Sequence, residues 1–121
     1  MKDKLHRELQ ESQIVVQVNY QKAILGVLRG GFTAGGQARY IELATGNKAS
    51  STPHNLIIIS NEQAIEFAEG LIEILRGTLN FNQENEWHLN YYSQQIDNLS
   101  SCIRIFRKGL NGSHINYEKK R

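Results

Sequence analysis

The sequence predicts an α+β fold: a four-stranded antiparallel sheet followed by a packed helix and a second helix with a heptad pattern. Three observations support this order. Four short runs of strand-like composition lie between residues 13 and 60. A helical pattern with a capping box then begins at Ser60. Apolar residues spaced by three and four finally run from Leu89 to Leu110, which is typical of a helix that packs along another helix.

The four strand-like runs fall at 14–20, 23–29, 38–44 and 55–59. Side chains alternate between the two faces of a strand, so Ile41 and Tyr40 point to opposite faces. If Ile41 faces the helix, Tyr40 faces outward, and the same alternation in the first run turns Gln17 outward as well. Gly26 marks a bulge or a close approach by another group.

Two connections interrupt these runs. We interpret Gly30–Gly36 as a hairpin loop that needs positive φ angles; the alternative is a mobile flap whose Phe32 stacks on a ligand. The stretch Thr45–Pro53 carries a glycine, a Ser-Ser-Thr cluster and the only proline, and we expect it to be a loop.

The first helix is expected from Ser60, whose hydroxyl and the side chain of Gln63 form the capping box, to a C-cap at Gly77. The second helix follows a polar linker at 80–86, and Gly109 is its expected C-cap. Its heptad pattern comprises Leu89, Tyr92, Ile96, Leu99, Ile103, Phe106 and Leu110. This apolar face can pack on the first helix of the same chain or on a second subunit.

Composition places the chain among small globular proteins. It has 121 residues and a formal net charge of +2, and Cys102 is its only cysteine. We expect one domain over 13–110, a flexible N-terminal arm over 1–12 and a basic C-terminal tail over 111–121. No segment reads as a signal peptide or a membrane span, so the expected location is the cytoplasm, with no membrane partner.

Charge is divided between the predicted sheet and the first helix. Residues 13–60 contain four basic residues and the single acid Glu42. Residues 61–79 contain four acids and the single base Arg76. The acids of the helix are Glu62, Glu66, Glu69 and Glu73. A basic sheet backed by an acidic helix attracts a polyanion on its sheet side only.

No catalytic motif competes with this interpretation. The four histidines are scattered without metal-ligand spacing, and no histidine lies near Cys102 in the sequence. The glycines of the 30–36 connection do not form a phosphate-binding motif. We therefore expect no enzymatic activity, no cofactor and no metal.

Part of the sequence resembles a group of single-stranded nucleic-acid-binding proteins. The similar segments are Ala38–Leu43 with the polar loop after it, Asn55–Ser60 and Ala64–Leu71. They resemble the third strand, the fourth strand and the helix of these proteins. The group comprises PUR-domain proteins, Whirly proteins and positive-cofactor-type transcriptional coactivators. The resemblance covers residues 13–79, a little over half of the chain. It implies a homodimer, a binding surface on the sheet and a role in transcription regulation.

We expect single-stranded DNA or RNA to bind on the outer sheet face, because such binding needs cations near phosphates and flat side chains on which bases stack. The candidate nucleic-acid-binding residues are Gln17, Asn19, Lys22, Arg29, Phe32, Arg39, Tyr40 and Lys48. Arg39 begins on the inner side by alternation and must reach the sheet edge to contribute. The alternative is a protein–protein assembly or adaptor module that uses the helix at 87–110; a small-ligand sensor with a cavity between sheet and helix is a third possibility.

Overall fold

The computed structural model describes residues 1–18, 23–81 and 85–115 and confirms an α+β fold, with five strands in place of the expected four. The strands are β1 (Ile14–Val18), β2 (Ala23–Phe32), β3 (Ala38–Glu42), β4 (Lys48–Ser51) and β5 (Leu56–Ile58). The α-helices are α1 (Asn61–Phe81) and α2 (Glu86–Arg107). Short 3-10 helices lie at Pro53–Asn55 and Gly112–His114. Among the described residues, neither α1 nor α2 has the length and apolar composition of a membrane-spanning helix.

The five strands form one antiparallel sheet in the order β4-β3-β2-β1-β5. The additional strand, β4, lies inside the stretch that we expected to be a loop. Its sequence Lys-Ala-Ser-Ser carries no apolar alternation, and it pairs with β3 in the register Arg39↔Ser50 and Ile41↔Lys48. This pairing, rather than local propensity, makes the segment a strand.

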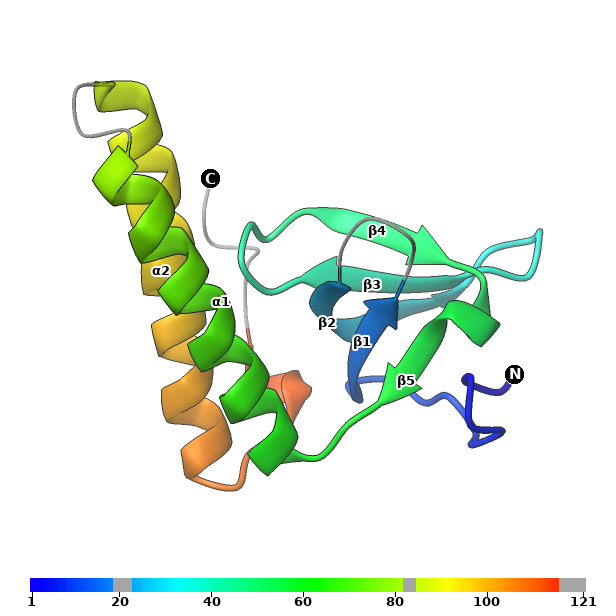
Figure 1. The fold of residues 1–121 in the computed structure, drawn as a ribbon. Helices are drawn as coiled ribbons and strands as arrows, with labels where there is room; N and C mark the ends of the chain where they lie inside the picture. The colour runs from blue at the N-terminus through cyan, green and yellow to red at the C-terminus, as the bar shows by residue number, and fades with distance from the viewer. Residues whose placement is uncertain (19–22, 82–84, 116–121) are drawn as a thin grey trace.

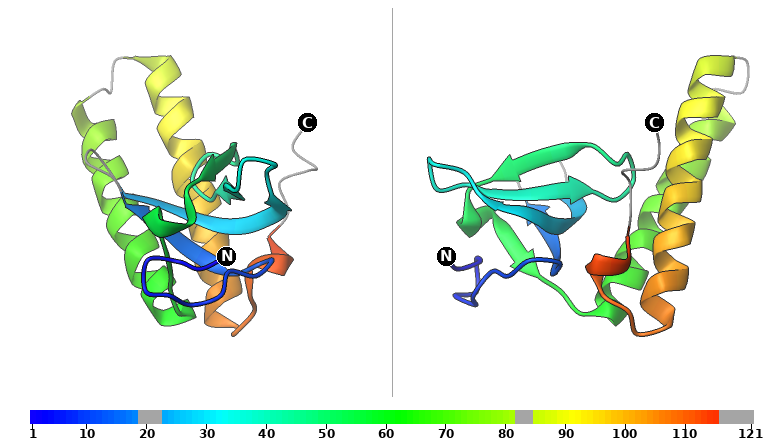
Figure 2. Two further views of the ribbon diagram at one scale, coloured as in Figure 1. Left: turned by 90° about the vertical axis from the view of Figure 1, so that its right-hand side faces the viewer. Right: turned by 180° about the vertical axis from the view of Figure 1, so that it is seen from behind.

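The two helices form an antiparallel hairpin on one side of the sheet, and the N-terminal residues lie on the side away from the helices (Figures 1 and 2). The main core fills the space between the sheet and the hairpin. It contains Val27 and Leu43 from the sheet side, Ala64 of α1, and Leu99 and Phe106 of α2. The part of the heptad face of α2 from Leu99 to Phe106 thus packs within its own chain.

The N-terminal arm that we expected to be flexible is packed against the sheet. We call residues 1–10 the N-terminal strap. Asp3 is completely buried, and its carboxylate accepts hydrogen bonds from the backbone N–H groups of Leu5 (2.9 Å), Arg7 (2.8 Å) and Ile58 (2.9 Å). The backbone N–H of Lys4 also donates to Leu56 O at 2.7 Å. The prediction was wrong because a polar stretch can be ordered by one buried, fully hydrogen-bonded carboxylate.

The strap closes a second apolar cluster on the sheet face opposite to the helices. Leu9 is buried there. The other buried members of this cluster are Val15, Leu28, Ala38, Tyr40 and Leu56. The outer sheet face is therefore covered by the chain's own N-terminal residues.

The predicted helix caps are confirmed at the start of α1 and at the end of α2. The backbone N–H of Ser60 donates to Gln63 Oε1 at 2.9 Å, and the backbone N–H of Gln63 donates to Ser60 Oγ at 3.1 Å. Gly109 follows α2 with φ +78°, and its N–H donates to Phe106 O at 3.0 Å. The expected C-cap at Gly77 is wrong, because α1 runs through this residue to Phe81.

The connection between β2 and β3 has the positive φ angles that its glycines predict. Gly30, Gly31 and Gly36 have φ angles of 99°, 72° and 85°. β2 extends further into this connection than expected and ends at Phe32, with a register shift between Leu28 and Phe32. This irregularity sets the positions of the side chains around the candidate site.

Candidate nucleic-acid interface

Three of the predicted cations meet in one hollow. Arg29, Arg39 and Lys48 line a depression of about 920 Å³ at the end of the sheet that carries β4. We call it the basic hollow. Its remaining lining residues are Gly30, Thr33, Tyr40, Ile41, Gly46, Ala49 and Ser50. None of these described lining residues is acidic, although the Glu11 carboxylate accepts a hydrogen bond from the backbone N–H of Gly30 at 3.1 Å. The lining itself therefore carries only positive side-chain charge.

The strand register explains why the cations converge. Ile41 lies opposite Lys48, and Arg39 lies opposite Ser50. Directly opposed residues in an antiparallel pair project from the same face, so all four side chains share one face of the sheet. Ile41 belongs to the core beneath the helices, which identifies this face as the helix side. The basic hollow is thus the part of the helix side that lies beside the β4 edge.

Hydrogen bonds hold two of the cations in place. The Arg39 Nη1 donates to Gly30 O at 3.0 Å. The Arg29 Nη2 donates to Gly112 O at 2.6 Å. These are bonds to neutral carbonyl oxygens rather than ion pairs, so both guanidinium groups retain their charge and further donors for an anion.

Tyr40 is not the exposed stacking platform that we predicted. Its orientation away from the helices is as expected, but only 3% of the residue is exposed, because the N-terminal strap covers this face. Its hydroxyl donates a hydrogen bond to Gln17 Oε1. Burial, with a smaller contribution from the charge of Glu42, raises the pKa of Tyr40 above its ordinary value. Oε1 of Gln17 accepts this same hydrogen bond, so the Tyr40 hydroxyl is not free to donate to a ligand on the outer face.

The structure separates Phe32 from the cations. Phe32 is 40% exposed and pairs with Ala38, which belongs to the cluster under the strap. Its ring therefore projects from the face opposite to the basic hollow. A ligand in the hollow reaches Phe32 only if it passes around the end of the β2–β3 hairpin. Asn19 and Lys22, the remaining predicted binding residues, lie outside the described residues.

Sequence reasoning missed two hydroxyl-bearing residues of the hollow, Thr33 and Ser50. Thr33 lies in the glycine-rich turn, and Ser50 lies in the stretch that we took for a loop. The signal that bears on Ser50 is its position two residues after Lys48, because alternate residues of a strand share a face. That signal has meaning only once the stretch is known to be a strand.

Other candidate chemistry is sparse in the described parts of the chain. Cys102 is buried in the main core, which is the environment of a structural thiol. Residues 1–18, 23–81 and 85–115 contain no group of three or more His, Cys, Asp or Glu side chains that could hold a metal ion.

Comparisons of the chain with protein-family models, with curated proteins and with solved structures give no match. The basic hollow is therefore the basis of the function proposed below.

Proposed function

We propose that this protein binds single-stranded DNA or RNA without catalysis and that the basic hollow is the binding site. The observation that carries the proposal is the convergence of Arg29, Arg39 and Lys48 around one depression without an acidic lining residue. Phosphate groups are attracted to such clusters, and each neutralised phosphate releases counterions.

The floor of the hollow favours a single strand over a duplex. Ile41 supplies apolar surface between the cations, and Gly30 and Gly46 leave room for close approach. A single strand can place a phosphate at the cations and an unpaired base over this floor. A duplex keeps its bases stacked inside and would use only the cationic rim. This proposal keeps the predicted ligand but moves its site from the outer face to the helix side of the sheet.

The proposal is tested by titrating a fluorescently labelled oligothymidylate with the protein and recording anisotropy at several salt concentrations. We expect binding that weakens as salt rises. We expect Arg39→Ala and Lys48→Ala each to weaken it and to reduce the slope of log K against log salt by about 0.7, the contribution of one phosphate contact. Lys4→Ala is the matched control, because Lys4 is an exposed lysine on the strap, away from the hollow.

Two results would contradict the proposal. The first is an absence of binding at low salt. The second is an equal loss of affinity in Lys4→Ala and Lys48→Ala, which would show that the protein attracts oligonucleotides only through its net charge. An otherwise identical duplex titrated in parallel reports the preference for single strands.

The second candidate function is protein–protein assembly through the helix at 87–110. Leu99 and Phe106 of this helix are committed to the core of the chain, so they are not free for a partner. Near its start, however, Trp87 and Tyr91 are 63% and 41% exposed and stack with ring centroids 4.9 Å apart. A pull-down that Trp87→Ala abolishes, with oligonucleotide binding unchanged, would favour this function. Both functions fit a cytoplasmic protein whose cysteine stays reduced.

A further inference from the structure

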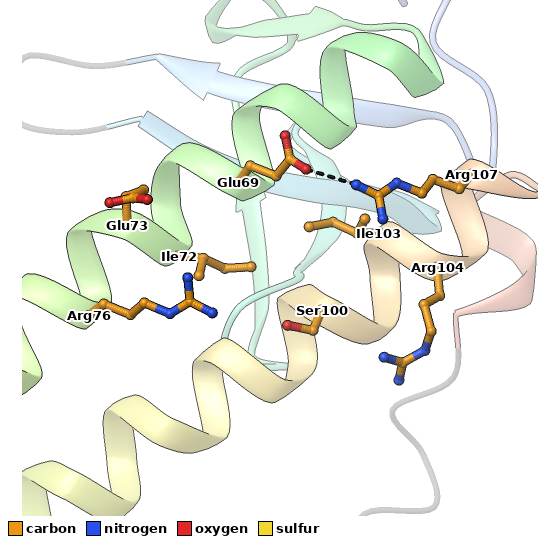
Figure 3. A pocket seen from close by; sticks show the side chains of 8 residues that line it. All are labelled: Glu69, Ile72, Glu73, Arg76, Ser100, Ile103, Arg104 and Arg107. Atoms are coloured by element: carbon orange, nitrogen blue, oxygen red, sulfur yellow. Dashed lines mark hydrogen bonds and ion pairs between the residues drawn. The ribbon is translucent and has the colours of Figure 1, made fainter.

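The outer surface of the helical hairpin carries a groove between α1 and α2, on the side away from the sheet (Figure 3). Its volume is about 480 Å³. Five of its lining residues are charged, and the nearly buried Ile72 and Ile103 lie at its base. The charged residues are Glu69, Glu73, Arg76, Arg104 and Arg107. We call this the interhelical groove.

The two helices contribute opposite charge. Both acids come from α1, and both Arg104 and Arg107 come from α2. The acids continue the stripe that includes Glu62 and Glu66 on α1. Arg107 Nη2 lies 2.9 Å from Glu69 Oε2, so the acidic and basic residues are at the same level along the hairpin. Arg76 is the exception to the division, since it extends from α1 toward α2 (Figure 3).

This arrangement is self-complementary under one particular symmetry. A twofold axis parallel to the helices places α1 of one copy over α2 of the other without shifting either along its length. The acids of each copy then face the arginines of its partner at the same level. A twofold axis that lies in the plane of the interface but perpendicular to the helices places α1 over α1, which brings like charges together. Isologous interfaces of this kind are the commonest way in which identical chains associate.

We propose that the interhelical groove is the interface of a homodimer whose twofold axis runs parallel to the helices. This inference goes beyond the proposed nucleic-acid site and does not depend on it. Helices of 21 and 22 residues are each roughly 30 Å long, and a face two helices wide offers on the order of 600 Å² per copy. That area is at the lower end of specific interfaces, so we expect a weak dimer held largely by charge.

A small anion is the competing occupant of the groove. Three arginines would attract it, but Glu69 and Glu73 lie in the same groove and would repel it. A second copy uses both signs of charge, whereas an anion is repelled by one of them. The observations therefore favour the second copy.

The test is a pair of charge reversals followed by sedimentation velocity on the full chain. We expect the wild type to form a dimer at low salt that dissociates as salt rises. Glu73→Arg and Arg104→Glu should each raise the dimer dissociation constant by at least about tenfold, because like charges then face each other across the interface. An equimolar mixture of the two variants should form a heterodimer again, because both reversed pairs are attractive in that combination.

Lys4→Glu is the control, because it changes the net charge by the same amount as Arg104→Glu. Lys4 lies on the strap, on the other side of the sheet from the groove. Circular dichroism of each variant establishes that it is folded. A monomeric wild type at all concentrations overturns the proposal, and so does a dimer that neither reversal affects. Binding of inorganic phosphate by a monomeric wild type, lost in Arg104→Glu, would assign the groove to an anion instead. The reversals leave the basic hollow intact, so the oligonucleotide titration distinguishes failure of the dimer from failure of the nucleic-acid site.

Discussion

The hydroxyl of Tyr40 on β3 donates a hydrogen bond to the side chain of Gln17 on β1, although β2 lies between these two strands. The tyrosine crosses β2 at Gly26. A Cβ added at Gly26 would lie 2.7 Å from Tyr40 Cδ2 and 3.1 Å from Ile41 O. The close approach predicted for this glycine is thus made by the Tyr40 ring, and the absence of a side chain at Gly26 is what allows the hydrogen bond to form.

Gly26→Ala should destabilise the protein. The added methyl group overlaps the Tyr40 ring, which is enclosed by the strap and cannot move away without disturbing the second cluster. Overpacking of this kind costs about 1–3 kcal/mol in the free energy of unfolding. Urea unfolding followed by circular dichroism measures the change. An unaltered midpoint would show that the ring can be displaced without loss.

Gly70→Ala should stabilise the protein and so serves as the contrasting variant. Gly70 lies inside α1, and an added Cβ meets no atom within 4 Å. Alanine in a helix interior is favoured over glycine by about 0.5–1 kcal/mol. The same urea experiment should therefore show a higher midpoint. A lower midpoint would mean that this surface of α1 is covered in solution.

Tyr40→Phe separates stability from binding. It removes the hydrogen bond to Gln17 and leaves Gln17 Oε1 without this donor. We expect the free energy of unfolding to fall by about 1 kcal/mol. Because the hydroxyl lies on the face opposite to the basic hollow, oligonucleotide affinity should not change. Anisotropy titrations of the folded variant check this. A marked loss of affinity would return Tyr40 to the binding surface and contradict its burial under the strap.

Asp3→Asn should lower the stability of the protein by an amount that depends on pH, because the Asp3 carboxylate anchors the strap. Burial alone would raise the pKa of Asp3, but hydrogen bonds from Ile58, Arg7 and Leu5 outweigh burial and hold this pKa below its ordinary value. A carboxylate with a lowered folded-state pKa stabilises the protein above its unfolded pKa of about 3.9, and this contribution disappears as pH falls through the folded-state value.

The variant should thus be less stable than the wild type at neutral pH by about 1–3 kcal/mol, and the difference should shrink as the pH falls below about 4. Urea unfolding across this pH range measures the difference. Lys4→Ala controls for a change in the exposed surface of the strap. A difference that stays constant at acid pH would show that Asp3 contributes through shape rather than charge.

Local sequence patterns predicted most of the fold. Alternation placed Tyr40 and Gln17 on the same face, and their hydrogen bond confirms it. The capping box at Ser60 and the glycines of the β2–β3 connection also matched, because each depends on residues close in sequence. These features are decided by backbone geometry within a few residues.

The site could not be predicted to the same extent, because it depends on contacts between distant segments. The pairing of polar β4 with β3 turns Lys48 toward Arg39, and no pattern in the sequence reports that pairing. The strap is ordered by Asp3, whose partner Ile58 is far away in sequence. The strap covers the face on which we expected the interface, and the pairing of β4 with β3 brings the cations together on the opposite face.

The strap also covers one edge of the sheet. β5 is an edge strand, and Asp3 and Lys4 occupy hydrogen-bonding groups of Ile58 and Leu56 along it. A chain cut after Gln10 would leave those groups and the apolar face beside them open to a strand from another molecule. Exposed edges of this kind seed fibrils. The opposite edge strand, β4, is short and bears a lysine, which already disfavours pairing with another molecule. The strap therefore protects the other edge, β5, from intermolecular strand pairing.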